Sequence, residues 1–186
     1  MNVGLLGLQG AFLDHIRHLE KLGAEYHLVK SIEDLDVIDC LIIPGGESTV
    51  MEKFLDMFAM TDPLKTKINA GMPVWGICAG SILLAETVDV RPGILGVLPA
   101  EVSRNAYGRQ LESTEMYIAV PELQRSQFHA MFIRSPRIEK VGPHVDVFSR
   151  VDHDPVFVRF GNVMATTFHP ELTDDSVFHE YFLSSV

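Results

Sequence analysis

The chain has 186 residues, 47% of them hydrophobic, which is enough to bury the core of one domain. Twenty-five acidic residues outnumber fifteen basic ones, and the formal charge of -10 disfavours nucleic acid or an anionic membrane surface as a partner. Two cysteines cannot form a disulfide framework, and no apolar run reaches the roughly 20 residues of a membrane span. No basic segment precedes the first apolar run, as a signal peptide would require, so we expect a cytoplasmic protein.

Strands and helices alternate in the first part of the sequence. Short apolar runs at 2–8, 25–30 and 37–43 predict buried strands. A helix is expected over 11–22, where apolar residues recur with helical spacing and Gly23 follows as a C-terminal cap. This alternation is typical of βαβ units, whose strands form a parallel sheet.

A glycine-rich loop and a helix follow the third predicted strand. The loop reads Pro44-Gly45-Gly46-Glu47-Ser48-Thr49. Paired glycines let backbone N–H groups approach a ligand closely, and the start of a helix favours negative charge. Thr49 and Glu52 have the spacing of a capping box. Because this loop follows a parallel strand, it is expected at the carboxyl edge of the sheet, where ligands bind.

A strand, a sharp turn and a helix are predicted around Cys78. The apolar run from Pro73 ends in Gly76-Ile77-Cys78-Ala79-Gly80, and a helix is expected over 81–86. This pattern is the thiol version of the Gly-x-Ser-x-Gly nucleophile elbow. The helix start beneath the sulfur favours the thiolate, which is the nucleophilic form. The alternative is a structural cysteine, because most free cysteines are simply buried.

Several short strands, without long helices between them, are expected in the second half of the chain. They cover 93–103, 115–120, 128–134, 145–151, 155–160 and 162–168, and a helix over 174–183 closes the chain. We therefore predict an α/β fold, a flavodoxin-like three-layer sandwich in a single domain spanning residues 1–186. Its central sheet should be mostly parallel, with a mixed or antiparallel part added by the C-terminal half.

A nucleophilic cysteine needs a base, and the base needs a group that orients it. His15 and His18 fall on the first predicted helix and are expected to face solvent; no cluster of further ligands accompanies them, so we expect no metal site. His179 is expected to be an ordinary helix residue.

His169 differs from the other histidines because it follows the last predicted strand and precedes Pro170-Glu171. Pro170 favours an extended conformation at His169, in which the side chains of His169 and Glu171 point the same way. Base and orienting carboxylate are then supplied by one tripeptide. We predict a catalytic triad of Cys78, His169 and Glu171.

Three of these motifs together resemble the class I (triad) glutamine amidotransferases: Pro-Gly-Gly-Glu-Ser-Thr at 44–49, Gly-Ile-Cys-Ala-Gly at 76–80 and Phe-His-Pro-Glu-Leu at 168–172. Further stretches look like those of the glutaminase subunits of pyridoxal phosphate synthase. They are Gly-Leu-Gln-Gly at 7–10, Arg-Asn-Ala-Tyr-Gly-Arg-Gln at 104–110 and Phe-Ile-Arg-Ser-Pro at 132–136. The resemblance covers essentially the whole chain.

The resemblance implies hydrolysis of L-glutamine through a γ-glutamyl thioester on Cys78, without metal or cofactor. It implies an oxyanion site made by backbone N–H groups of Gly45, Gly46 and Ala79. The residues that match the family's glutamine-binding positions are Gly46, Glu47, Ser48, Arg104, Ile133 and Arg134. Either arginine could bind the α-carboxylate, because a guanidinium binds a carboxylate bidentately.

The resemblance also implies a protein partner, a pyridoxal phosphate synthase barrel subunit that receives the ammonia for vitamin B6 synthesis. We expect the Gly45-Gly46 peptide to act as a switch that completes the oxyanion site on docking, and the 7–10 turn to lie near the docking face. Three alternatives remain open from the sequence: a glutaminase subunit of the imidazole glycerol phosphate synthase type, a cysteine peptidase on a similar scaffold, and a non-catalytic binding subunit.

Overall fold

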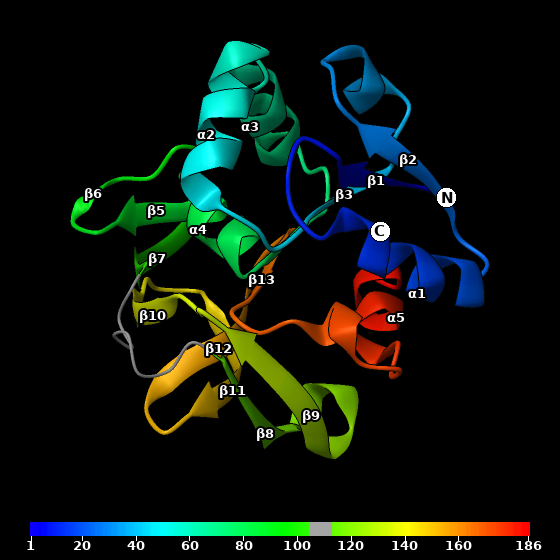
Figure 1. Cartoon of the computed structure of the whole chain (residues 1–186). Helices are drawn as coiled ribbons and strands as arrows, with labels where there is room; N and C mark the ends of the chain where they lie inside the picture. The colour runs from blue at the N-terminus through cyan, green and yellow to red at the C-terminus, as the bar shows by residue number, and fades with distance from the viewer. Residues whose placement is uncertain (105–112) are drawn as a thin grey trace.

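The computed structural model describes residues 1–104 and 113–186. A seven-stranded sheet forms its centre, in the order β11-β12-β13-β4-β3-β1-β2 (Figure 1). The strands are β1 (Asn2–Leu6), β2 (Glu25–Val29), β3 (Cys40–Ile43), β4 (Val74–Ile77), β11 (Asp146–Val151), β12 (Asp154–Phe160) and β13 (Val163–Thr166). Neighbours from β13 to β2 are parallel, whereas β11 and β12 join antiparallel. The predicted α/β class and the mostly parallel sheet are confirmed.

Helices and a second sheet cover one face of the central sheet. The helices are α2 (Ser48–Met57), α3 (Thr61–Asn69) and α4 (Ala79–Leu84), and the second sheet has the order β10-β7-β5-β6. Its strands are β5 (Ala85–Val88), β6 (Arg91–Pro92), β7 (Leu98–Ser103) and β10 (Arg137–Val141). Leu41 and Val74 are fully buried against this layer, as expected of strands that alternate their side chains between two faces.

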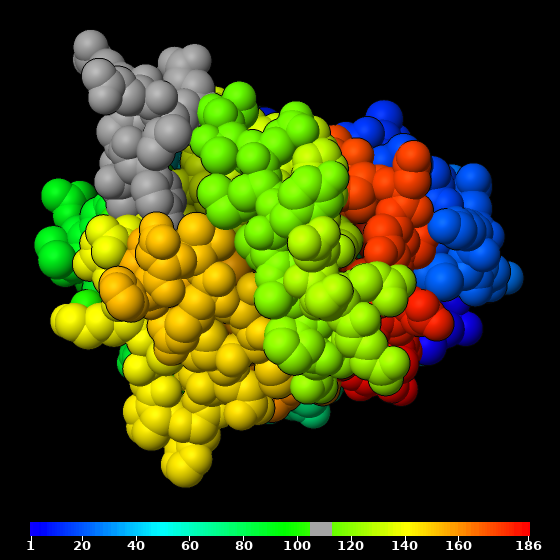
Figure 2. Space-filling view, turned by 90° about the horizontal axis from the view of Figure 1, so that it is seen from below, coloured from blue at the N-terminus to red at the C-terminus, as the bar shows by residue number. Residues whose placement is uncertain are grey.

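The opposite face is covered by both ends of the chain and by a hairpin. Here lie η1 (Phe12–His15), α1 (Ile16–Lys21), α5 (Val177–Leu183) and the β8–β9 pair (Ser113–Val120 and Arg125–Ile133). Figure 2 shows the hairpin, in green, between the orange β11–β12 region and the red C-terminal segment. Cys40 and Trp75, adjacent in sequence to Leu41 and Val74, belong to this second core. The fold therefore has three layers with a core on each side of the central sheet.

Some predicted elements differ from the structure. The helix expected over 11–22 begins as the 3-10 turn η1 before α1. The helix expected over 81–86 ends at Leu84, and the following residues pair with β7 as β5. The β-branched residues Thr87 and Val88 favour that strand. β10 was not predicted, because only Ile138 of its residues is buried and the segment is otherwise mainly polar.

Among the described residues there are three further 3-10 turns, η2 (Glu33–Asp36), η3 (Pro121–Leu123) and η4 (Pro170–Leu172). Within the described ranges, no helix combines the length and the apolar composition that crossing a membrane would require.

Candidate active site

Cys78 occupies a strained turn between β4 and α4. Its backbone has φ 49° and ψ -103°, outside the regions that non-glycine residues usually adopt. The flanking glycines make the turn possible. A Cβ on Gly76 would lie 2.6 Å from the carbonyl carbon of Gly80, and a Cβ on Gly80 would overlap the carbonyl oxygen of Ile43. The structure therefore has the sharp strand–turn–helix elbow that the sequence predicts.

The sheet brings His169 to Cys78, although 91 positions separate them. β13 runs parallel to β4 with Thr166 opposite Ile77, so both strands end at the same edge. The N–H of Cys78 donates to the carbonyl oxygen of Thr166 at 2.8 Å. The N–H of His169 in turn donates to the carbonyl oxygen of Met131 at 2.8 Å, which ties the residues after β13 to β9.

His169 and Glu171 form a buried hydrogen bond. Nδ1 of His169 lies 2.7 Å from Oε1 of Glu171, and because a carboxylate only accepts, Nδ1 carries the proton. The contact is the predicted one, but the extended geometry offered for it is wrong. Pro170 begins the 3-10 turn η4, and this turn folds Glu171 back toward the imidazole. Glu171 is completely buried, and His169 is 7% exposed.

The electrostatics of the site favour a charged imidazole. Burial alone would lower the pKa of His169, but polar interactions with Cys78 and Glu171 outweigh burial and raise this pKa to about 10. Burial likewise opposes ionisation of Glu171, yet the hydrogen bond from His169 and the neighbouring imidazoles hold the pKa of Glu171 below its usual value. An imidazolium next to a cysteine is the neighbour that typically stabilises a nucleophilic thiolate.

A cavity of about 450 Å³ opens beside Cys78, which is within the usual size range of small-molecule pockets. Its wall contains Cys78, His169, Ala79 and Ile82 together with residues from four other segments. These are Ala11; Gly45, Gly46, Glu47, Ser48 and Thr49; Arg104; and Ile133 and Arg134. Every residue expected at the substrate or oxyanion site therefore lines one cavity. The sulfur of Cys78 lies 3.8 Å from the carbonyl oxygen of Ile133.

The Gly45-Gly46 loop is held by the turn that follows β1. The carbonyl oxygen of Gly45 accepts a hydrogen bond of 3.0 Å from the N–H of Ala11. The side chain of Gln9 accepts one of 2.8 Å from the N–H of Glu47. Gly10 has φ +103°, and a Cβ there would overlap the carbonyl oxygen of Gly45. The two loops are thus packed directly against each other, which explains why Ala11 reaches the cavity.

Both arginines of the cavity wall are paired with carboxylates. Arg104 lies 2.5 Å from Glu52 and 3.7 Å from Asp89, and Arg134 lies 3.1 Å from Glu47. The predicted capping box is wrong, because α2 begins at Ser48 and Glu52 turns to Arg104 instead. The rest of the 104–110 stretch lies outside the described residues.

The sequence analysis missed a buried group of histidines. His15 and His18 were expected to face solvent, but they are 0% and 2% exposed, and His179 is also fully buried. These histidines are buried because α5 packs on α1. The residue pattern of either helix alone does not reveal that contact. The i, i+3 spacing of His15 and His18 is a signal that they share a helix face. In the ranges that the structure describes, no three acidic, histidine or cysteine residues are placed to hold a metal ion.

A cysteine on a strained elbow, with a histidine–carboxylate pair from the neighbouring strand, is the arrangement of triad-type thiol enzymes. A solved structure described as "Crystal structure of glutamine amidotransferase" matches with a TM-score of 0.92 and 42% sequence identity, covering 98% of this chain and 97% of that one. PurLQS from Thermotoga maritima has the same fold, with a TM-score of 0.74 at 16% identity over 98% of this chain and 97% of that one.

Curated relatives are similar over their whole length. "Pyridoxal 5'-phosphate synthase subunit PdxT" of Thermotoga maritima is 48% identical over 187 residues, covering 100% of both chains. The protein of the same name from Ruminiclostridium cellulolyticum is 46% identical, covering 99% of this chain and 98% of that one. The SNO glutamine amidotransferase family matches residues 5–186, and the chain belongs to this family.

Proposed function

We propose that the chain is the glutaminase subunit of a pyridoxal phosphate synthase. It hydrolyses L-glutamine to L-glutamate and ammonia and passes the ammonia to a separate synthase subunit for vitamin B6 synthesis. The observation that carries this proposal is the cavity lined by Cys78 and by His169, whose imidazole is paired with buried Glu171, in a chain 48% identical to PdxT of Thermotoga maritima from end to end. Residues 1–186 act as one glutaminase domain, and the protein works in the cytoplasm.

Catalysis proceeds in two halves. The thiolate of Cys78 attacks the side-chain amide carbon of glutamine, and the new carbon–sulfur bond gives a tetrahedral intermediate. The imidazolium of His169 protonates the amide nitrogen, the carbon–nitrogen bond breaks, and ammonia leaves a γ-glutamyl thioester. His169 then takes a proton from water as the water oxygen attacks the thioester carbon, and glutamate departs as the thiolate is restored. Glu171 keeps the imidazole oriented throughout.

The oxyanion of both tetrahedral intermediates is stabilised by backbone N–H groups. Ala79 is the first residue of α4, so its N–H has no partner within the helix and is available to the cavity. The second donor comes from the Gly45-Gly46 loop. The carbonyl of Gly45 faces Ala11, and in a trans peptide the N–H of Gly46 points the opposite way. Docking against the 7–10 turn would release this carbonyl and let the peptide reorient, at little steric cost for a Gly-Gly unit.

The α-amino and α-carboxylate groups of glutamine require opposite charges at the mouth of the cavity. The carboxylate of Glu47 and the carbonyl of Ile133 suit the ammonium group. Arg104 and Arg134 suit the carboxylate, because each guanidinium presents paired donors. Gly46 and Ser48 contribute groups from the loop and from the start of α2. Recognition of a small zwitterion, rather than a peptide, follows from this distribution.

A partner follows from the chemistry of the product. Ammonia in neutral water is mostly ammonium, which is not nucleophilic, so its release is useful only when an acceptor takes it up directly. The proposed acceptor is the barrel subunit of pyridoxal phosphate synthase.

The test measures glutamate release from glutamine by the purified chain, with and without the synthase subunit, for the wild type and for Cys78→Ala. We expect the wild type to be stimulated by the synthase subunit and Cys78→Ala to be inactive in both conditions. Glutamate release that persists in Cys78→Ala would refute the mechanism. Wild-type hydrolysis that depends on a different synthase would refute the pathway and leave the mechanism standing.

A further inference from the structure

Three buried histidines lie directly behind Glu171, and the mechanism does not use them. His15 and His18 lie near the start of the chain, in η1 and α1, and His179 lies in α5 near the end of the chain. The ring of His179 stacks on that of His18, with centroids 4.2 Å apart and an interplanar angle of 10°. The rings of Trp75, in β4, and His179 pack in a T-shaped arrangement with centroids 5.0 Å apart. We call His15, His18 and His179 the histidine cluster.

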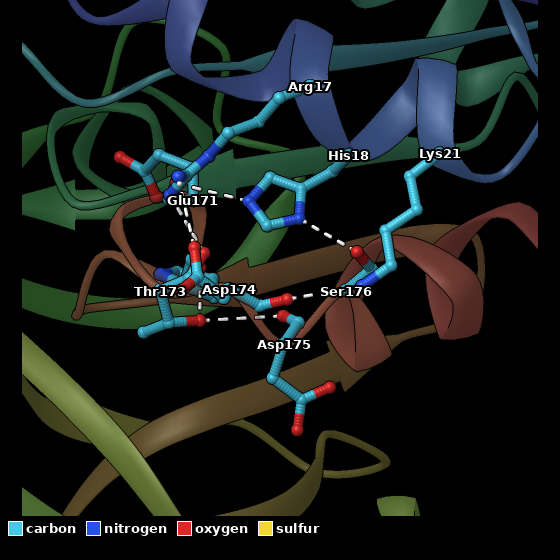
Figure 3. Close-up of polar contacts among 9 residues, drawn as sticks. Arg17, His18, Lys21, Glu171, Thr173, Asp174, Asp175 and Ser176 are labelled. Atoms are coloured by element: carbon cyan, nitrogen blue, oxygen red, sulfur yellow. Dashed lines mark hydrogen bonds and ion pairs between the residues drawn. The ribbon is translucent and has the colours of Figure 1, made fainter.

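The contacts of His18 with the 171–176 segment determine its tautomer. Nε2 of His18 lies 3.1 Å from the carbonyl oxygen of Glu171, and Nδ1 lies 3.0 Å from Oγ of Ser176. A carbonyl only accepts, so Nε2 carries the proton and Nδ1 accepts from the serine hydroxyl. Arg17 adds hydrogen bonds of 2.8 Å to the carbonyl oxygens of Glu171 and Thr173. Figure 3 shows these α1 side chains reaching toward the segment. The backbone of Glu171 is therefore held by α1.

The second oxygen of the Glu171 carboxylate is left over by these contacts. Oε1 accepts from His169, whereas Oε2 is buried and has no hydrogen-bond partner among the described residues. Nε2 of His15 and Nδ1 of His179 are the two cluster nitrogens in the same condition. η1, which carries His15, packs on η4, which carries Glu171. A buried polar atom without a partner is rare and calls for an explanation.

One shared proton decides which kind of group His15 presents at Nε2. Nδ1 of His15 lies 2.9 Å from Nε2 of His179, so one of these two nitrogens donates to the other. If His179 donates, neutral His15 carries its proton on Nε2. If His15 donates, its Nε2 is a bare lone pair in the field of the Glu171 carboxylate, which is unfavourable. Burial lowers the pKa of His15 to about 4 despite the opposing charge of Glu171, so the ring is neutral near pH 7.

We infer that His15 is a positioning residue, in which a neutral imidazole held by His179 presents its Nε2–H to the Oε2 side of Glu171. The row of interacting side chains Cys78, His169 and Glu171 then continues to His15 and His179. Glu171 is held by His18 and Arg17 through its carbonyl, whereas His15 acts on its carboxylate electrostatically, because neither Nε2 of His15 nor Oε2 of Glu171 has a hydrogen-bond partner among the described residues. Because its dipole faces the carboxylate, His15 also favours the ionised form of Glu171 that accepts from His169. This inference rests on the proposed glutaminase function only in the test that measures glutamine hydrolysis.

A direct test that requires no activity reads the tautomer of His15. The full-length protein is labelled with ¹⁵N in its histidine rings, and long-range ¹H–¹⁵N correlation spectra are recorded near pH 7. Assignment uses His15→Gln and His179→Phe. We expect His15 as the neutral Nε2–H tautomer, and we expect its ring nitrogen shifts to move in Glu171→Gln. A His15 ring protonated on Nδ1 alone, or shifts that ignore Glu171→Gln, would overturn the inference.

The kinetic test compares His15→Phe with His15→Gln, whose side-chain amide restores an N–H donor. The matched control is His27→Phe, the same change at a half-exposed histidine that pairs with Asp34 instead. In the complex with the synthase subunit, His15→Phe should lower kcat for glutamine hydrolysis by about tenfold or more with KM within about twofold, as expected when a buried carboxylate loses a neighbouring N–H dipole. His15→Gln should recover most of this loss, and His27→Phe should match the wild type.

Equal kcat in His15→Phe and His27→Phe would contradict the positioning role, and so would a loss that His15→Gln fails to reduce while its unfolding midpoint matches the wild type. If His15→Phe does not fold, the tautomer of His15 measured in the wild-type protein alone decides whether the inference holds. If the wild type itself fails to hydrolyse glutamine, the proposed function is refuted, and the tautomer still decides whether His15 supports Glu171.

Discussion

Gly45 lies against the imidazole of His169, so closely that a Cβ on Gly45 would overlap Cε1 of the ring. The loop proposed to bind the oxyanion and the base that delivers the proton are therefore in direct contact. On its other side, the same loop touches the turn after β1 through the Ala11–Gly45 hydrogen bond. A displacement of the turn after β1 would therefore be transmitted to His169 through Gly45 alone.

This contact leads to a prediction for Gly10. Gly10→Ala should lower partner-stimulated turnover by roughly tenfold or more, because the new Cβ would push on the carbonyl of Gly45 and displace the oxyanion loop. The control is Gly71→Ala. Gly71 has a nearly equal φ of +107°, and a Cβ there would meet nothing within 4 Å. Both changes strain the backbone, but only Gly10→Ala adds a clash with backbone, so Gly10→Ala should have both the lower unfolding midpoint and the lower kcat at a temperature where both variants are folded. Equal turnover in the two variants would argue against the loop contact.

The roles proposed for His169 and Glu171 predict unequal losses. His169→Ala removes both the proton donor and the base, and it should be about as inactive as Cys78→Ala. Glu171→Ala leaves the imidazole in place but unoriented, so it should retain roughly ten to a hundred times more turnover than His169→Ala. The measurement is single-turnover formation of the thioester with labelled glutamine. Equal losses with a lowered unfolding midpoint for Glu171→Ala would instead assign Glu171 a role in folding.

The two arginines of the cavity differ in exposure, and this predicts different effects on KM. The Arg104 side chain is 29% exposed, and that of Arg134 is 70% exposed. Attraction between charges is weaker where water screens it. Arg104→Ala should therefore raise KM for glutamine by about tenfold or more, and Arg134→Ala by only a few-fold, with smaller changes in kcat. A larger KM effect from Arg134→Ala would identify it as the carboxylate ligand.

The histidine cluster predicts loss of stability in mild acid. Burial lowers the pKa of His15 from its ordinary 6.5 to about 4. As pH falls from 6.5 toward 4, His15 becomes protonated in the unfolded chain but stays neutral in the folded protein. The free energy of unfolding therefore decreases, by up to about 3 kcal/mol from this group. Burial also lowers the pKa of His18 and His179, which adds in the same direction.

This loss is measurable by urea unfolding at pH 7.5, 6 and 5. The difference between the wild type and His15→Phe should narrow as pH falls, because the variant lacks one buried imidazole. A His15→Phe variant that loses as much stability as the wild type between pH 7.5 and 5 would show that His15 is protonated in the folded protein.

Local patterns in the sequence were sufficient to predict the elbow, the central sheet and the histidine–glutamate pair. The elbow is determined by glycines two residues on either side of Cys78, and the pair is contained in three consecutive residues. These features depend on short-range sterics and on the parallel sheet, so single-sequence reasoning can reach them.

The features that the sequence did not reveal depend on packing between distant segments. His15 is buried because α5 lies on α1, and its partner His179 is 164 positions away. Glu52 pairs with Arg104, 52 positions away. Local helix rules instead predicted that Glu52 caps the start of the helix. The 3-10 turn at Pro170 was missed for a different reason: proline fixes only its own φ, and the tertiary contacts of Glu171 determine the rest of the turn.

Arg17 and His18 reach from the start of the chain to the backbone of Glu171 near its end, while Cys78 comes from the middle. A fragment that contains a supported site must therefore span at least Arg17 to Glu171. During synthesis, Cys78 leaves the ribosome long before His169 and Glu171. A nascent chain can therefore assemble the site only after residue 171 has emerged and packed against α1.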